Sequence, residues 1–116
     1  MKITNLAAAP SQPVTMEGAA NVSRCVPIGK ADGAPNTSVR VFTMAPGGHT
    51  PYHAHAWEHT NYIIAGEGEL VDAEGKAHPL KPGDFALVLP HEKHQYRNSS
   101  ATEPFVMICA VPKSYE

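Results

Sequence analysis

Four of the seven histidines in this 116-residue chain fall within one short segment, at His49, His53, His55 and His59. Side chains alternate between the two faces of an extended strand, so the last three, separated by even numbers, are expected on one face. Three imidazoles there repel one another as cations and need polar partners as neutral rings. A divalent metal ion satisfies them, because the neutral imidazole nitrogen is a common ligand. The cluster therefore predicts a metal site whose fourth ligand comes from elsewhere; the alternative is a solvated polar loop, and the direction of His49 is left open.

The segments that position this cluster are predicted to be β-strands. Eleven prolines are spread along the chain, and each of them breaks a helix interior. Short β-branched runs between turn residues predict strands at 22–28, 38–44, 59–65, 69–72, 76–80, 85–89, 94–98 and 105–111, with extended backbone over 52–57. Turns are expected at 45–48, 66–68, 74–75 and 81–84. About eight to ten short strands with no obligatory helix indicate an all-β fold that closes as a barrel or doubles into a jelly roll.

Composition narrows the class of protein. A length of 116 residues suits one domain over 1–116, of which residues 1–21 are expected to be partly irregular. A formal net charge of −2 at pH 7 gives no basic surface, so neither nucleic acid nor membrane is an expected partner. Two cysteines do not make a disulfide framework. With an opening apolar stretch too short for a signal peptide, a cytoplasmic location is expected.

Two spaced motifs resemble those of the cupin superfamily. The first joins a glycine and an HxH step to a later histidine and glycine, in the order Gly47-(x5)-His53-x-His55-(x3)-His59-(x6)-Gly66. The second runs from Gly83 through Pro90 to His94, with Asn98 after three more residues. Together the motifs occupy residues 47–98. The resemblance implies a single cupin domain, folded as a double-stranded β-helix (a jelly-roll β-barrel) with the metal inside.

The chain departs from the commonest cupin pattern at the ligand positions. His59 occupies the place usually held by glutamate, and Glu58 lies one residue earlier, so this segment is similar to small cupins with four histidine ligands. The second motif places the fourth ligand at His94 rather than His91, and His78 is expected on the surface. The resemblance therefore implies one divalent transition metal ion, with manganese or iron expected first and nickel, copper or zinc as alternatives. Its expected ligands are His53, His55, His59 and His94.

The same resemblance and strand alternation predict a pocket beside the metal. Its predicted residues are Arg40, Phe42, Tyr96, Met107 and Cys109, and Ile63 and Val111 are further candidates for apolar walls. Each has an alternative as an ordinary core or surface side chain. Trp57 is expected to shield the ligand turn or an interface. Glu58 either orients a ligand or is solvated.

The expected function is that of a small metalloenzyme acting on a small organic substrate. Four neutral ligands leave the ion its full charge, and no side chain in the motifs stands out as a general base. We therefore expect oxidative chemistry of the dioxygenase type, with a redox-active metal. A metal-dependent isomerase or lyase and a non-catalytic cupin that binds or senses a small molecule are the alternatives. A homodimer is expected, because an exposed N-terminal strand invites pairing.

Overall fold

The computed structural model describes residues 1–116, which form nine strands and three short 3₁₀-helices. The 3₁₀-helices are η1 (Leu6–Ala8), η2 (Lys30–Asp32) and η3 (Lys113–Tyr115). The strands are β1 (Gln12–Pro13), β2 (Ala20–Ile28), β3 (Thr37–His49), β4 (His59–Ala65), β5 (Gly68–Val71), β6 (Ala77–Leu80), β7 (Phe85–Val88), β8 (Gln95–Arg97) and β9 (Phe105–Pro112). No helix has the length and apolar character needed to cross a membrane. The all-β architecture expected from the sequence is confirmed.

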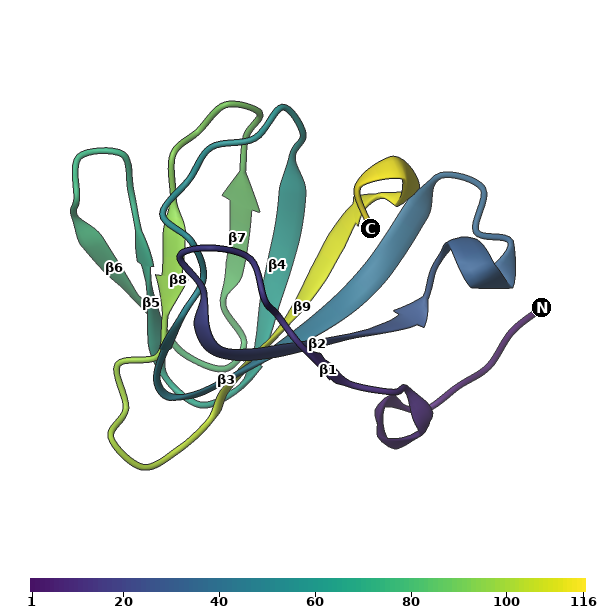
Figure 1. The fold of residues 1–116 in the computed structure, drawn as a ribbon, viewed down its shortest axis with the longest axis horizontal. Coiled ribbons are helices and arrows are strands. Elements are labelled where there is room, and N and C mark those ends of the chain that lie inside the picture. Colours follow the sequence, from purple (N-terminus) through teal and green to yellow (C-terminus); the bar gives the residue numbers. More distant parts are fainter.

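The long strand β3 joins the two sides of the sheet. The strand order is β6-β5-β8-β3-β9-β4-β7, with β2 paired to β3 and β1 to β2. Residues 37–44 of β3 pair with β9, whereas its last residue, His49, pairs with Arg97 of β8. In Figure 1, β3 and β9 run side by side from the right of the view, and β5, β6 and β8 stand at the left, with β4 and β7 between them. The sheet therefore curls around an interior.

Two local predictions about the backbone near the histidines are wrong. The expected turn at 45–48 lies inside β3, because Gly47 has a φ of +76° and the β2–β3 register shifts between Ala20 and Val22. These features make a bulge that bends the strand without reversing it. The segment 52–57 is a loop rather than a strand, and only His53 forms an isolated bridge, to His94. The loop of residues 50–58, called the ligand loop below because it carries His53 and His55, is therefore held by contacts with neighbouring segments and not by strand pairing of its own.

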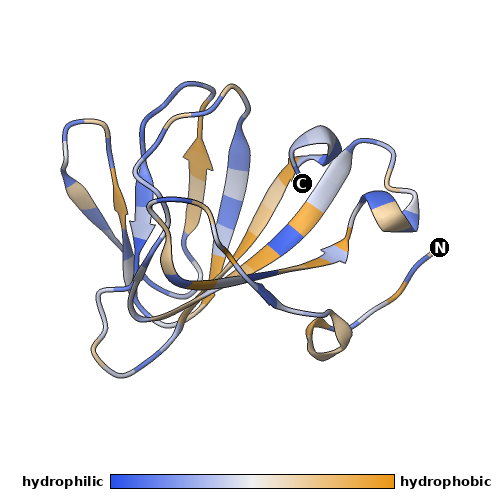
Figure 2. Cartoon of the chain, viewed as in Figure 1, coloured by the Kyte–Doolittle hydropathy of each residue, from blue (hydrophilic) through white to orange (hydrophobic).

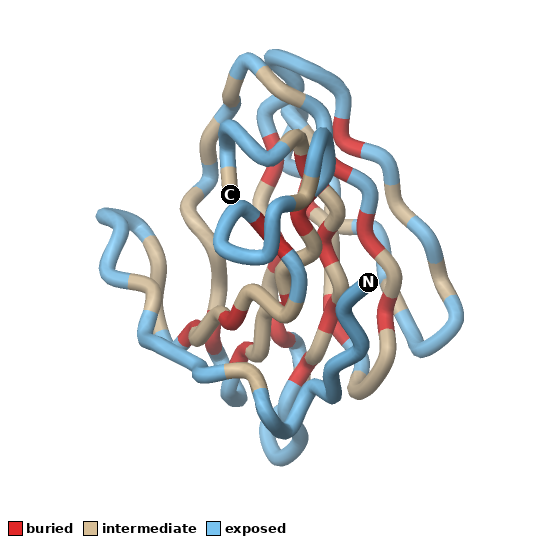
Figure 3. The backbone as a smooth tube through the Cα atoms, turned by 90° about the vertical axis from the view of Figure 1, so that its right-hand side faces the viewer, coloured by how far each residue is buried: buried red, intermediate tan, exposed pale blue.

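The core lies inside the curl. Its buried cluster comprises Val22, Met44, Ile63, Tyr96, Phe105 and Met107. Figure 3 shows the buried residues along the central strands and the exposed ones in the loops and terminal segments. In Figure 2, β7 is drawn in apolar colours although it lies at the end of the strand order. On its outer side Phe85 and Leu87 are 74% and 55% exposed, so this edge strand presents an apolar surface.

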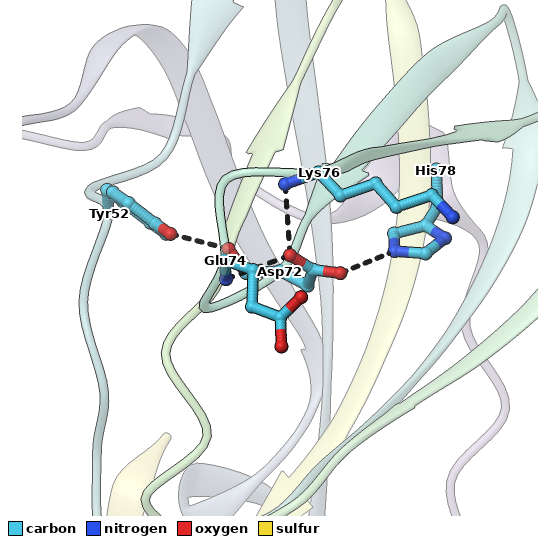
Figure 4. Close-up of polar contacts among 5 residues, drawn as sticks. All are labelled: Tyr52, Asp72, Glu74, Lys76 and His78. Atoms are coloured by element: carbon cyan, nitrogen blue, oxygen red, sulfur yellow. Dashed lines mark hydrogen bonds and ion pairs between the residues drawn. The ribbon is translucent and has the colours of Figure 1, made fainter.

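The β5–β6 hairpin anchors the start of the ligand loop. Asp72 accepts backbone hydrogen bonds from Glu74 and Lys76 and pairs with Nε2 of His78 at 2.8 Å, which builds the expected turn (Figure 4). The hydroxyl of Tyr52 donates to the backbone carbonyl of Asp72. His78 is an exposed residue, as expected. It supports the hairpin and lies outside the histidine cluster.

Gly66 marks the sharp step between β4 and β5. Its φ is +76°, and a Cβ added there would lie 2.0 Å from the carbonyl oxygen of Pro104. Both the left-handed backbone and this close approach exclude a side chain.

Replacing Gly66 with alanine should therefore lower the free energy of unfolding by roughly 2–4 kcal/mol. Gly75→Ala is the matched control, because Gly75 has a φ of +82° but no atom within 4 Å of its added Cβ. That control should cost only about 1–2 kcal/mol, the backbone contribution alone. Urea denaturation measures both values. Equal losses for the two variants would contradict the close packing of β4–β5 against residue 104.

Candidate metal centre

The four predicted ligands come from three parts of the chain and converge at one place. His59 begins β4, His94 directly precedes β8, and His53 and His55 lie on the β3–β4 loop. The backbones of His53 and His94 exchange two hydrogen bonds, of 3.1 and 2.9 Å. Five pairs among the four rings have centroid separations between 4.9 and 5.3 Å. The convergence comes from long-range pairing of the loop with the start of β8, and not from alternation along one strand.

The ring nitrogens are spaced as a metal donor set. His53, His55 and His94 each offer one nitrogen within 4.8 Å of the other two. His59 lies outside that mutual group, but its Nε2 is 3.2 Å from Nε2 of His94. His59 and His94 are both buried, whereas His53 and His55 are partly exposed. The set thus faces a partly open space on one side.

Backbone and amide oxygens fix the tautomers of three rings. Nδ1 of His55 donates to the carbonyl of Trp57 at 2.8 Å, and Nδ1 of His94 donates to the carbonyl of Glu92 at 2.7 Å. Nδ1 of His59 donates to Oδ1 of Asn61 at 2.6 Å. Carbonyl oxygens only accept hydrogen bonds, so in each neutral ring the proton lies on Nδ1 and the lone pair on Nε2. These outer contacts are of the kind that orient metal-binding histidines.

Asn61 holds the most buried of these contacts. Its Oδ1 also accepts a hydrogen bond of 2.8 Å from the hydroxyl of Tyr96, and its Nδ2 donates to the carbonyl of Ile108 at 3.4 Å. Asn61 is 1% exposed and Tyr96 is also 1% exposed. The amide can therefore present only its oxygen to His59. Sequence reasoning missed Asn61, although its even spacing from His59 on one strand could have identified it.

The facing nitrogens of His59 and His94 are the strongest sign of a cation site. With both protons on Nδ1, two lone pairs point at each other across 3.2 Å. Two acceptors at this distance repel unless a cation or a shared proton lies between them. A divalent ion removes the repulsion for the whole set at once. The donor chemistry of these residues therefore fits a transition metal.

Burial keeps the rings in the form that binds metal. Burial is the largest cause that lowers the pKa of His59 to about 3; the neighbouring His94, His55 and Arg40 act in the same direction, and the hydrogen bond that His59 donates to Asn61 opposes the shift. Burial is also the largest cause that lowers the pKa of His53, His55 and His94. Neutral imidazoles need not lose a proton before they bind a metal ion.

Two aromatic rings, Trp57 and then Tyr115, stack on one face of His55. Trp57 lies parallel to His55, with centroids 4.1 Å apart, and Tyr115 of η3 lies parallel to Trp57 at the same separation. The Glu116 side chain accepts hydrogen bonds from the Ser38 hydroxyl and from the backbone of η2, which fixes the turn that carries Tyr115. Trp57 therefore shields the ligand turn, whereas Glu58 is exposed to solvent.

The histidines open into a cavity of about 390 Å³. The five residues predicted for the pocket all line it: Arg40, Phe42, Tyr96, Met107 and Cys109. Ile63 and Val111 do not, and their prediction as walls is wrong. Ile63 shares the face of His59 but lies farther along β4, in the core cluster. Val111 lies at the far end of β9, paired with Ser38.

One wall of the cavity was not predicted. Residues 12–16 of the N-terminal segment line it, because β1 pairs with β2 and brings Gln12 opposite Arg24. A two-residue strand has too little pattern to be recognised from sequence. The remaining histidines take no part: Nδ1 of His49 contacts the Thr50 carbonyl at 3.2 Å, and His91 is exposed with a φ of +66°. Asn98 braces a loop through the carbonyls of Met44 and Glu103.

The chain matches a known family and several named proteins. The family model described as a cupin domain matches residues 40–111. L-ectoine synthase from Halomonas elongata is 34% identical over 70 residues, which are 60% of this chain and 51% of that protein. L-ectoine synthase from Saccharopolyspora erythraea is 49% identical over 37 residues, 31% of this chain and 27% of that protein. The matches thus span about a quarter to a half of the length of these relatives.

Solved structures share the whole architecture. The polyketide cyclase RemF from Streptomyces resistomycificus superposes with a TM-score of 0.91 at 26% identity, covering 97% of this chain and 79% of that one. A predicted oxalate decarboxylase from Thermotoga maritima gives a TM-score of 0.83 at 20% identity, covering 97% and 99%, and this likeness concerns the fold alone. The expected double-stranded β-helix is confirmed.

The hydrogen-bond pattern makes a prediction about tautomers. In the metal-free protein at pH 7, His55, His59 and His94 should each be neutral with the proton on Nδ1, because an oxygen acceptor faces that atom. Long-range ¹H–¹⁵N NMR of ¹⁵N-histidine-labelled protein distinguishes the two tautomers. Asn61→Ala should release only the His59 ring from its tautomer and leave His55 unchanged. A proton on Nε2 of His59 in the unaltered protein would contradict the proposed orientation of the donor set.

Proposed function

This chain belongs to the cupin family, and on that premise we propose that it is a metal-dependent enzyme acting on a small organic substrate. The observation that carries the proposal is the pair of facing Nε2 atoms of His59 and His94, 3.2 Å apart at the cavity. A cavity of about 390 Å³ is in the size range of small-molecule sites. The similarity to RemF, whose name describes a cyclase, supports catalysis over simple binding.

We propose that Nε2 atoms of His53, His55, His59 and His94 hold one divalent transition metal ion. His59 is included because Asn61 orients its ring toward His94, so that one metal ion can contact the Nε2 atoms of both rings. When bound, such an ion polarises a substrate oxygen as a Lewis acid or exchanges electrons with the substrate. Manganese and iron stay the first expectations, with nickel, copper and zinc as alternatives.

The reaction class that we place first is non-oxidative, the isomerase or lyase alternative. The named relatives are synthases and a cyclase, which supports a rearrangement or ring closure at a polarised carbonyl. Oxygenase chemistry stays a prediction and is the second candidate. It is favoured by the walls of the cavity, which carry no carboxylate side chain to serve as a general base.

The protein's own groups exclude water and hold protons in place. Burial raises the pKa of the Tyr96 hydroxyl far above its ordinary value, so the group stays protonated and keeps donating to Asn61. Tyr96 therefore fixes the orientation of His59 through Asn61 and does not serve as a base. Phe42, Trp57 and Met107 provide apolar surface around the substrate.

Assembly and location are also parts of this proposal. A homodimer stays a prediction, and the apolar side chains Phe85, Leu87 and Leu89 next to the sheet edge offer a surface for it, besides the short strand β1. A cytoplasmic location stays a prediction, supported by the two free cysteines, Cys25 and Cys109.

The metal proposal predicts a stoichiometry of about one ion per chain, because the four histidines form a single donor set at one end of their converging elements. His59→Ala and His94→Ala should each weaken binding strongly, on the order of 100-fold or more, because each removes a ligand. His78→Ala is the matched control, since that histidine lies on the β5–β6 hairpin. Elemental analysis after dialysis against a competing chelator measures occupancy. Full occupancy in the His59→Ala/His94→Ala double variant would refute the four-histidine site.

Placing the isomerase or lyase reaction before the oxygenase reaction predicts how turnover depends on the metal and on oxygen. Protein reconstituted separately with manganese, iron, copper and zinc should turn over small keto acids, ketones or phenols with zinc as well as with manganese, and under nitrogen as well as air. Mass spectrometry of the products measures turnover. Turnover that requires both oxygen and a redox-active metal would reverse the order and favour the oxygenase.

A further inference from the structure

We propose that the substrate is a small organic carboxylate, bound by Arg40 on the wall of the cavity and presenting a second oxygen to the histidine centre in the same cavity. The role of that second oxygen rests on the proposed metal function. The binding of the carboxylate by Arg40 stands on separate observations, namely the contacts of this guanidinium and the charges that line the cavity.

Arg40 is a cation without a counter-ion. It lies on β3 opposite Cys109 of β9, and its Nη2 is 3.1 Å from the Cys109 sulfur. Its Nη1 makes one long contact of 3.4 Å with the backbone carbonyl of Tyr115. Its Nε is buried and has no hydrogen-bond partner. None of the four ion pairs of the protein includes Arg40. A half-buried charge with only neutral partners is costly, and an anionic ligand would remove that cost.

The walls of the cavity carry positive charge only. Its 19 lining residues include Arg24 and Arg40 and contain neither aspartate nor glutamate. A divalent ion held by neutral imidazoles would add its whole charge to the same space. Arg40 lines the same cavity as His53, His55, His59 and His94. Electrostatic focusing inside such a cavity favours an anion over a neutral molecule of the same shape.

The surroundings of Arg40 fit a carboxylate with an apolar body. The guanidinium carbon lies 5.0 Å from the centre of the Phe42 ring, which supports the planar group from one face. A planar guanidinium binds a carboxylate through two parallel N–H donors. Phe42, Trp57 and Met107 line the same cavity and offer ring and thioether surface. The substrate class is therefore a monocarboxylic acid with an aromatic or alkyl body and a keto, enol or hydroxyl oxygen.

Trp57 makes this inference measurable, because it is the only tryptophan and lines the cavity. Phenylacetate and phenylacetamide are suitable probes, since they share a shape and differ in charge. Titration of the zinc-loaded full chain, followed by Trp57 fluorescence, should show phenylacetate binding at least about tenfold more tightly, as expected for one charge-assisted pair. Arg40→Gln should reduce this preference to the part that the zinc charge alone supplies, because it weakens binding of the acid and not of the amide, and Arg40→Lys should retain more of it.

Arg97→Gln is the matched control, because Arg97 pairs with Glu69 at 2.7 Å and does not line the cavity. It should leave both affinities unchanged. Equal affinities for acid and amide in the unaltered protein would overturn the inference without any variant, and so would a preference that is undiminished in folded Arg40→Gln protein. If Arg40→Gln fails to fold, the acid and amide affinities of Arg40→Lys and of the unaltered protein still test the inference.

The same titration on chelator-treated protein separates this inference from the proposed metal function. If the chain binds no metal, the Arg40-dependent preference for the acid should still be present. If the chain binds metal through the four histidines but does not prefer the acid, the carboxylate inference alone fails.

Discussion

The structure of this site depends on one electrostatic constraint, the burial of imidazole lone pairs that face one another. Nδ1–H of both His59 and His94 donates a hydrogen bond to an oxygen atom. Their Nε2 atoms, each with a lone pair, therefore face each other at 3.2 Å. Protonating a ring to relieve the contact is opposed by burial, which lowers the pKa of both histidines. A bound cation satisfies both atoms without placing a proton in the interior. The rest of the site serves to keep these rings in that arrangement.

The fold supplies that arrangement through long-range pairing. The bulge at Gly47 bends β3, so that its first part pairs with β9 and its end reaches β8. The ligand loop is then held against the start of β8 by the reciprocal backbone bonds of His53 and His94. Asn61, oriented by Tyr96, fixes the His59 ring from inside the barrel. The unbalanced positive charge of Arg40 lies in the same cavity and makes the site suited to an anionic ligand.

Much of this could be predicted from the sequence, and the failures have physical causes. Proline spacing predicted an all-β chain, and the two motifs placed His53, His55, His59 and His94 together. Alternation along one strand was the wrong reason, since residues 52–57 form a loop whose position depends on a strand about forty residues later. Asn61 was missed although its even spacing from His59 places both side chains on one face of β4. The wall made by residues 12–16 was missed because it depends on a tertiary contact that leaves no local pattern. The turn predicted at Gly47 is a bulge instead, because a glycine with positive φ occurs both in chain reversals and in β-bulges.

X-ray diffraction from crystals of the metal-loaded protein, recorded at the absorption edge of the metal, tests the central claim most directly. The account predicts one anomalous peak per chain, about 2.0–2.2 Å from Nε2 of His53, His55, His59 and His94. The Nδ1–H of His59 should still face Asn61 in that structure. A peak elsewhere in the chain, or a peak held without His59 while its ring turns away from His94, would contradict the four-histidine centre.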